Sequence, residues 1–234
     1  MKFLLNVGSE KSGTTWLYKY FKEHPDFYDM GKELNIIQRD DLIPILEDVS
    51  EYRKDIESFF QTVSNINQVT GDFTHYEGSS ENVFRLIKNG LLKYDIEVVP
   101  VYIMRDPIRR GWSAWNTIGG GKIPTQSTAS HFVMTNFISC KYKETIEALD
   151  NVFAKPLYFF YEDFFTQTNI DKICDELQIS QHSAACDNII NASSYKKMPE
   201  KFLKTFGKSL KNKEAVKYVF ERFKNVPWKL EDYS

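Results

Sequence analysis

The sequence predicts an α/β protein of three layers, in which a central parallel sheet is flanked by helices. Short apolar stretches typical of buried strands recur along the chain, and stretches with apolar residues at helical spacing separate them. Strands that alternate with helices imply a parallel sheet covered on both faces. No internal repeat and no long Pro/Gly/Ser-rich linker divides the chain, so residues 1–234 are expected to fold as a single domain.

The chain opens with a strand, a tight turn and a helix. Residues 3–7 are an apolar run that predicts a buried strand. Residues from about 13 to 23 predict a helix with an aromatic and aliphatic face, and Pro25 stops it. The turn between them carries Gly8 and Gly13.

The middle of the chain continues the alternation. The expected elements are a short strand at 27–30, charged helical pieces at 40–60, a strand at 68–73, a helix capped by residues 79–81 and a central strand at 97–104. Pro100 is expected at the start of that strand or at a bulge, because proline cannot donate to the ladder.

The pattern beyond residue 104 is mostly helical. Asp106 is a good N-cap and Pro107 a good first residue for a helix over 107–115. A loop at 118–130, a longer helix at 131–149, a strand at 156–161 and a mostly helical C-terminal part follow. In the last part, Glu162 or Asp163 is expected to cap the next helix.

Charge and cysteine content exclude several classes of protein. The 30 Lys and Arg residues nearly balance the 32 Asp and Glu residues, and no basic stripe indicates a nucleic-acid partner. Cys140, Cys174 and Cys186 are scattered and odd in number, which favours reduced thiols in the cytoplasm over a disulfide framework or a metal site. The apolar start is too short for a signal peptide or a membrane span.

The turn over residues 8–15 (Gly-Ser-Glu-Lys-Ser-Gly-Thr-Thr) predicts an anion site. A glycine-bearing turn between a strand and a helix presents unpaired N–H groups and the positive end of the helix dipole. Its glycines have the spacing of the phosphate loop G-x-x-x-x-G-K-[ST], but Thr14 stands where that loop has lysine. The lysine lies inside the turn instead, at Lys11.

Residues 11–16, Lys-Ser-Gly-Thr-Thr-Trp, resemble the 5′-phosphosulfate loop of sulfotransferases, which use 3′-phosphoadenosine 5′-phosphosulfate (PAPS). The resemblance implies a P-loop-like sulfotransferase fold and a donor site that contains Lys11, Ser12, Gly13, Thr14 and Thr15. Lys11 would stabilise the leaving 5′-phosphate oxygen. The next residue, Trp16, is open to two interpretations: it stacks on adenine, or its helical spacing places it in the core.

A second anion site is expected directly after the strand at 97–104. Arg105, Asp106 and Pro107 begin a stretch that resembles the family's R-D-P-x(5)-S motif, whose arginine and serine contact the 3′-phosphate. These roles fall on Arg105 and Ser113. Lys196 and Lys197 lie where the family has a basic loop, and the alternative for them is a solvated pair.

The general base has two candidates. Glu33 follows Lys32 in a stretch that resembles the K-E-x-x-F-F region of Golgi-type carbohydrate sulfotransferases, in which the glutamate is the base. His75 is the alternative, since cytosolic sulfotransferases use histidine and histidine titrates in the right range. Residues 71–76 resemble the Golgi-type G-E-K-T-P-x-Y segment, but Phe73 stands in place of its lysine.

The resemblance implies transfer of a sulfonate group from PAPS to a hydroxyl or amine of a small-molecule or glycan acceptor, with no metal required. Two alternatives stay open. A nucleotide kinase or NTPase would need Mg²⁺ ligands and a lysine at the helix start. A non-catalytic module would bind PAPS or its product 3′-phosphoadenosine 5′-phosphate (PAP) without turnover.

Overall fold

The computed structural model describes residues 1–34, 49–118, 140–186 and 210–229. Within them lies one five-stranded sheet with the order β2-β3-β1-β4-β5, and each neighbouring pair is parallel. The strands are β1 (Lys2–Gly8), β2 (Phe27–Tyr28), β3 (Val69–Asp72), β4 (Glu97–Met104) and β5 (Leu157–Phe160). Strands β1 and β4 are buried along almost their whole length, as expected for the centre of a parallel sheet.

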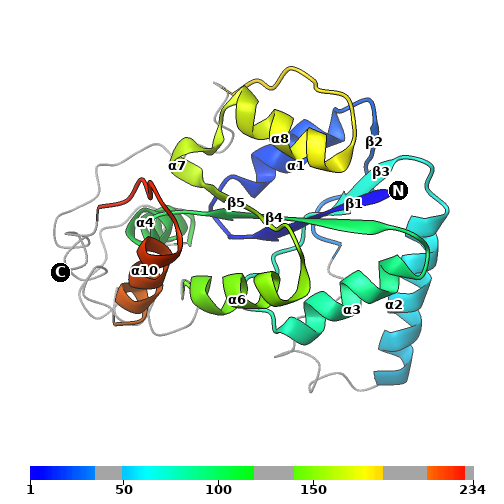
Figure 1. Cartoon of the computed structure of the whole chain (residues 1–234), viewed down its shortest axis with the longest axis horizontal. Helices are drawn as coiled ribbons and strands as arrows, with labels where there is room; N and C mark the ends of the chain where they lie inside the picture. Colours follow the sequence, from blue (N-terminus) through cyan, green and yellow to red (C-terminus); the bar gives the residue numbers. More distant parts are fainter. Residues whose placement is uncertain (35–48, 119–139, 187–209, 230–234) are drawn as a thin grey trace.

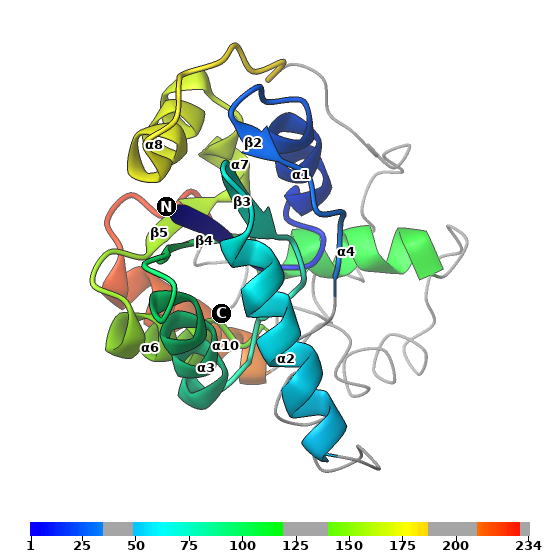
Figure 2. The same ribbon diagram turned by 90° about the vertical axis from the view of Figure 1, so that its right-hand side faces the viewer.

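Helices cover both faces of this sheet, which confirms the three-layer α/β class (Figure 1). One face carries α1 (Thr14–Lys22), α7 (Tyr161–Phe164) and α8 (Gln167–Leu177). The other carries α2 (Val49–Ser64), α3 (Glu81–Leu92), α6 (Tyr142–Val152) and α10 (Leu210–Arg222). Helix α4 (Pro107–Ile118) extends from the end of the sheet, as the turned view shows (Figure 2).

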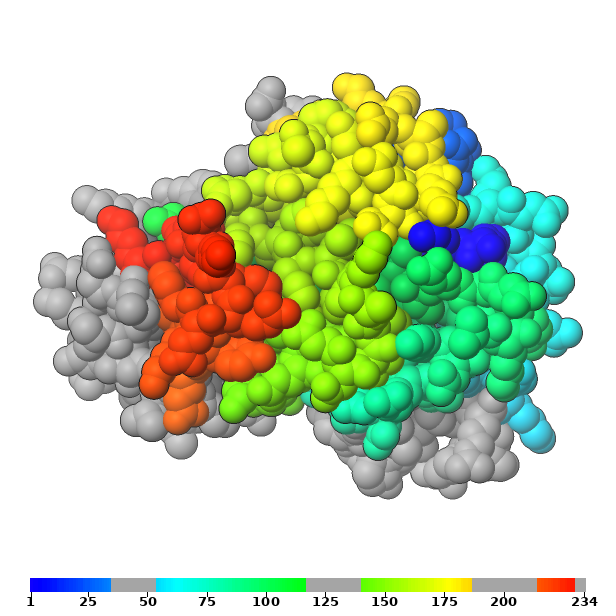
Figure 3. Space-filling view, viewed as in Figure 1, coloured from blue at the N-terminus to red at the C-terminus, as the bar shows by residue number. Residues whose placement is uncertain are grey.

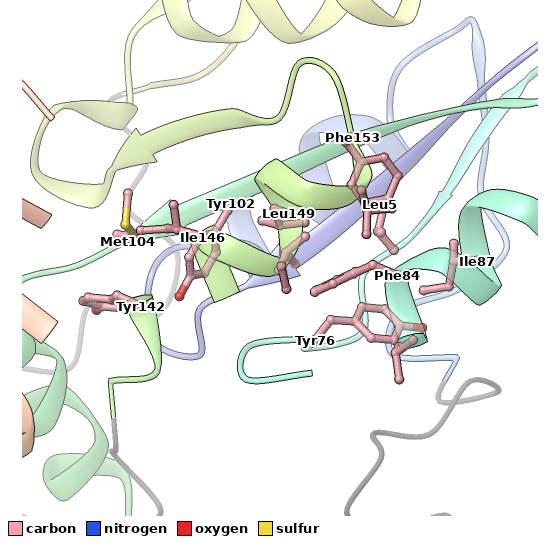
Figure 4. Packing of buried hydrophobic residues seen from close by; sticks show 14 of the residues in the cluster. Leu5, Tyr76, Phe84, Ile87, Tyr102, Met104, Tyr142, Ile146, Leu149 and Phe153 are labelled. Atoms are coloured by element: carbon pink, nitrogen blue, oxygen red, sulfur yellow. The ribbon is translucent and has the colours of Figure 1, made fainter. Parts of the chain in front are cut away.

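Two hydrophobic clusters, one on each face, hold the layers together. The larger joins β1 and β4 to α2, α3 and α6, and Figure 4 shows its centre, with Leu5 and Tyr102 from the sheet, Phe84 from α3 and Leu149 from α6. The smaller packs α1, α7 and α8 against the opposite face. On the outside, α8, α6 and α3 form a continuous surface with α10 beside α6 (Figure 3).

The strand order indicates where a ligand is expected to bind on this sheet. Strands β1 and β3 are neighbours, yet the helix after β1 lies on one face and the helix after β3 on the other. In open α/β sheets, such a divergence of connections opens a crevice at the carboxyl ends of the strands. The turn with Lys11 follows β1 at this edge.

Two element predictions are wrong in detail. Pro100 lies at neither the start of β4 nor a bulge: it pairs with Leu5, and the register shift comes later, between Asn6 and Gly8. Pairing with β5 begins only at Val101, so Pro100 has no paired residue on that side of β4.

The predicted helix at 131–149 begins later than expected. Cys140 and Lys141 are not helical, and α6 starts at Tyr142. Residues 35–48 and 119–139 lie outside the described part of the chain. Most of the loop predicted at 118–130 and the first part of the predicted helix fall in the second of these ranges.

Candidate functional site

The turn after β1 is closed by hydrogen bonds to the end of β4. The Ser9 N–H and hydroxyl both donate to the Ile103 carbonyl, at 2.8 and 3.1 Å. The hydroxyls of Ser9 and Ser12 are 2.6 Å apart, and the Ser12 N–H donates to the Ser9 carbonyl. Ser12 is fully buried, so its side chain fixes the shape of the turn from inside.

Helix α1 begins without a side-chain cap. Its N-cap is Gly13, with φ 84°, and no side chain among the described residues caps it. A Cβ at Gly13 would lie 2.7 Å from Cζ of Phe165, so both the positive φ and the close contact require glycine. Thr14 is buried and Thr15 partly exposed in the first turn, which contains no acidic residue. The open N–H groups and the helix dipole favour an anion here.

Lys11 stands at the rim of this anion site. Its backbone has φ 64°, in the left-handed region that non-glycine residues rarely adopt. Its side chain is 25% exposed, and Nζ lies 3.7 Å from the carboxylate of Glu10. The ammonium is therefore accessible and weakly paired, as a group that meets an incoming anion must be.

Arg105, the first residue after β4, contacts the same turn. Its Nη1 donates to the Lys11 carbonyl at 2.7 Å, and its guanidinium lies 4.0 Å from the centre of the Tyr161 ring. The Tyr142 hydroxyl holds its backbone, donating to the Arg105 carbonyl. The buried Nε of Arg105 has no hydrogen-bond partner within the described residues, so one donor is left for a ligand.

Helix α4 begins as its sequence predicts. Asp106 Oδ1 accepts from the Arg109 N–H at 2.9 Å, which confirms the N-cap, and Pro107 is the first helical residue. Ser113 lies on the same helix and is partly exposed. The sequence order thus places Arg105 before α4 and Ser113 within it.

The Tyr-Glu-Asp-Phe segment after β5 supports this turn. The carboxylate of Glu162 accepts from the Asp106 N–H at 3.2 Å and from the Trp228 indole at 3.0 Å. Burial raises the pKa of Glu162, and the hydrogen bond from Trp228 opposes the rise. The prediction that Glu162 or Asp163 caps the next helix is wrong, because both lie inside α7 and Thr166 caps α8.

The two candidate bases face each other. Glu33 Oε1 lies 3.8 Å from His75 Nε2, and Glu33 also accepts a hydrogen bond from Lys32 at 2.7 Å. That bond lowers the pKa of Glu33, and the charge of Lys11 adds to the effect. Burial lowers the pKa of His75, whose Nδ1 has no partner in the described part of the chain and lies against Gly8. Both groups can therefore accept a proton at neutral pH.

Other predicted residues have different surroundings. Trp16 is buried between Tyr20, Phe164 and Phe165, in the core position that its helical spacing favoured. Phe73 is also buried in the core, in the same hydrophobic cluster as Trp16. Lys196 and Lys197 lie outside the described residues.

A buried ion pair, which was not predicted from the sequence, contacts the turn. Arg110 donates to both carboxylate oxygens of Glu77, and its Nε donates to the Glu10 carbonyl. Within α4, Arg110 is four residues before the buried Ala114, so helical spacing alone could have placed it on the inner face. Nothing in the local pattern indicated Glu77 as its partner.

The described residues also bear on metals and membranes. They include no cluster of three His, Cys, Asp or Glu side chains arranged to hold a metal ion. No helix in the same part of the chain is long and apolar enough to cross a membrane.

A parallel sheet in which two strand–helix turns meet at the carboxyl ends of the strands is typical of nucleotide-type α/β proteins. Comparison with known families gives the class directly. A model of the sulfotransferase domain family matches residues 3–225, so the chain belongs to this family of transferases. No curated protein sequence matches the chain significantly.

Several solved sulfotransferase structures are similar to this chain at low sequence identity. The sulfotransferase from Alicyclobacillus acidocaldarius is 14% identical with a TM-score of 0.59, over 94% of this chain and 96% of that one. Mouse sulfotransferase SULT7A1 complexed with PAP is 17% identical with a TM-score of 0.46, over 78% and 60%. The sulfotransferase domain of the Synechococcus PCC 7002 olefin synthase is 13% identical with a TM-score of 0.46, over 100% and 92%. The first of these supports the shared fold.

Proposed function

We propose that the protein transfers a sulfonate group from PAPS to a hydroxyl or amine of a small-molecule or glycan acceptor. The observation that carries the proposal is the contact between Arg105 Nη1 and the Lys11 carbonyl at 2.7 Å. PAPS has anionic groups at two ends, and the contact brings the two predicted anion sites to one edge of the sheet. A donor that spans both turns fits this arrangement.

In the proposed complex, the α1 N-terminus and residues 11–15 bind the 5′-phosphosulfate, and Arg105 with Ser113 binds the 3′-phosphate. Such a ligand would accept hydrogen bonds from the unpartnered Nε of Arg105 and from the uncapped N–H groups after Gly13. Trp16, as a core residue, would support this helix from beneath. Lys196 and Lys197 stay candidates for the 3′-phosphate.

The reaction needs one proton acceptor and one stabilised leaving group. Glu33 takes the proton from the acceptor as its oxygen or nitrogen attacks sulfur in line. The bond between sulfur and the 5′-phosphate oxygen breaks, and PAP leaves with the electron pair of that bond. Lys11 stabilises the charge that develops on the phosphate oxygen. His75, 3.8 Å from Glu33, is the alternative base.

We place the reaction in the cytoplasm, because the three scattered cysteines, Cys140, Cys174 and Cys186, do not have the pattern of a disulfide framework. A soluble acceptor rather than nucleic acid fits the near-zero net charge of −2.

Calorimetry with PAP, and with ATP plus Mg²⁺, tests the donor. We expect PAP to bind without metal and ATP to bind weakly. Replacing Arg105 with Ala removes charge-assisted hydrogen bonds of about 1.5–3 kcal/mol, or roughly 10- to 100-fold in PAP affinity. The variant Lys19→Ala removes an exposed positive charge from the last turn of α1 and is the matched control. Tight, Mg²⁺-dependent ATP binding would instead favour a kinase or NTPase.

Turnover is tested with radiolabelled PAPS and a panel of sugars, phenols and amines. We expect Lys11→Ala to lower kcat by roughly 10²- to 10³-fold, the usual cost of losing one group that stabilises a developing charge. PAP binding without any transfer or slow PAPS hydrolysis by the parent protein would indicate a non-catalytic binding module.

A further inference from the structure

We propose that the buried pair of Arg110 and Glu77 is a positioning device, which holds the anion-binding turn in the shape that receives the donor. The inference rests on the proposed function and adds two residues to its machinery, neither of which touches the ligand. The structural basis is a series of hydrogen bonds that links Glu77 through Arg110 to the backbone carbonyl of Glu10 in the turn.

The pair is deeply buried and fully engaged. The side chain of Arg110 is 6% exposed and that of Glu77 is 8% exposed. Nη1 and Nη2 of Arg110 donate to the two carboxylate oxygens of Glu77 at 2.7 and 2.5 Å. The Tyr102 hydroxyl donates to the same carboxylate at 3.2 Å. Burial acts to lower the pKa of Arg110, but the Glu77 carboxylate and the other groups around the guanidinium together raise that pKa, so the guanidinium stays charged.

The third contact of Arg110 reaches the anion-binding turn. Its Nε donates to the Glu10 carbonyl at 2.9 Å, while Arg105 donates to the next carbonyl, that of Lys11, at 2.7 Å. Two arginines that flank the start of α4 therefore hold two consecutive carbonyls of the turn. The Glu10–Lys11 peptide bond is not among the cis bonds of the chain, so the Lys11 N–H points opposite to the Glu10 carbonyl.

This orientation matters for anion binding. A peptide carbonyl that faced the bound sulfonate or phosphate would repel it, whereas an N–H attracts it. By fixing the Glu10 carbonyl, Arg110 directs that oxygen away from the ligand and keeps the N–H side of the peptide available. Glu77 in turn fixes the guanidinium of Arg110. Nη1 and Nη2 bind the two carboxylate oxygens of Glu77, and Nε remains to donate to the Glu10 carbonyl.

Stability alone does not explain such a pair. Removing two charges from water costs several kcal/mol per ion, and well-packed apolar replacements of buried pairs are often neutral or stabilising. A positioning role and a stabilising role therefore predict different results for variants that remove the pair as a unit.

The test uses the full chain with two variants at the pair. Arg110→Met with Glu77→Leu removes both charges together, whereas Arg110→Lys keeps the ion pair but loses the fork that holds Glu77 and the Glu10 carbonyl at once. Glu57→Gln with Lys93→Met removes an exposed ion pair and is the matched control. The measurements are the thermal midpoint, PAP affinity by calorimetry, donor and acceptor KM, and amide hydrogen exchange of residues 9–13.

We expect both variants to fold with thermal midpoints near the parent's and to bind PAP roughly 10-fold or more weakly, because the ligand must first order the turn. Donor KM rises by a similar factor while acceptor KM stays unchanged, and the amides of the turn exchange faster than in the parent. The control pair leaves all four measurements at parent values.

Parent-like PAP affinity and parent-like exchange in Arg110→Lys would overturn the proposal, even if the double variant does not fold. The exchange measurement needs no ligand, so it separates this inference from the proposed function. If the parent binds no PAP but the variants still loosen the turn, the donor assignment fails and the positioning role stands.

Discussion

The carboxylate of Glu33 and the imidazole of His75 face each other at 3.8 Å, although they follow different strands of the sheet. The two alternatives for the general base are therefore neighbours in one acid–base pair. Burial lowers the pKa of His75, and the hydrogen bond from Lys32 lowers the pKa of Glu33. Because both are unprotonated at neutral pH, their roles must be separated by experiment.

Replacing Glu33 with Gln removes the proton acceptor that we assign to the reaction. We expect kcat to fall by roughly 10²- to 10⁴-fold, the range of general-base contributions, with PAP affinity within about 2-fold of the parent's. His75→Ala is expected to lower kcat less. Glu23→Gln, an exposed residue at the C-terminus of α1, serves as the control. A larger loss in His75→Ala than in Glu33→Gln would assign the base to histidine.

The pH profile of kcat distinguishes the same alternatives without a mutation. An ordinary glutamate titrates at about 4.3 and an ordinary histidine at about 6.5, and both groups are shifted downward here. With Glu33 as the base, kcat stays flat as the pH falls from 8 to about 5.5, because the carboxylate remains ionised. A fall in kcat within this pH range, with its midpoint below the ordinary pKa of histidine, would point to His75.

The fold was predictable because its strands are marked locally. The apolar runs at 3–7 and 97–104 became the two central strands, and glycine, proline and capping residues marked the helix starts. The position of Pro100 within its strand was harder to predict. A proline is tolerated inside β4 only because β5 begins to pair beyond it, and the local sequence does not show where that pairing begins. The order of the strands likewise depends on crossovers rather than on any single segment.

The candidate site was predictable only where its residues form a contiguous motif. Lys11 and Arg105 belong to such motifs, and the structure brings them together. Glu77 and Arg110 were missed because 33 positions separate them and their pairing exists only after folding. The contact of Glu162 with Asp106 was missed for the same reason. The sequence suggested Glu162 only as a helix cap.

Gly90 marks a close approach of two helices that tolerates no side chain. A Cβ at this position in α3 would lie 2.0 Å from Cε2 of Phe60 in α2. Alanine would gain helix propensity of about 1 kcal/mol, but overpacking costs typically 1–3 kcal/mol. A contact as short as 2.0 Å favours the upper end of that cost, so we expect a net loss of about 1–2 kcal/mol. Chemical denaturation measures it.

The neighbouring Asn89 is exposed in the same helix, so Asn89→Ala gains propensity without a clash and is expected to be neutral or stabilising. Equal unfolding free energies for Gly90→Ala and Asn89→Ala would contradict the close packing of α2 on α3.

Thr166 is the cap of α8, since its hydroxyl accepts from the Asn169 N–H at 3.3 Å. Thr166→Ala is expected to destabilise the protein by about 1 kcal/mol, the typical cost of a lost N-cap. Asp163→Ala, three residues earlier and exposed, is expected to change the unfolding free energy by less than about 0.5 kcal/mol. A larger loss of unfolding free energy for Asp163→Ala than for Thr166→Ala would show that Asp163, not Thr166, caps the helix.

The indole of Trp228 gives the protein a built-in optical probe. It donates to Glu162, which holds the first amide of the turn that begins α4, and its ring lies 5.8 Å from that of Tyr142, which grips Arg105. Because only two contacts separate Trp228 from the Arg105 turn, we expect a ligand bound at that turn to change the fluorescence of Trp228. Fluorescence titration that compares the parent with Trp228→Phe will follow occupancy of that turn without labels.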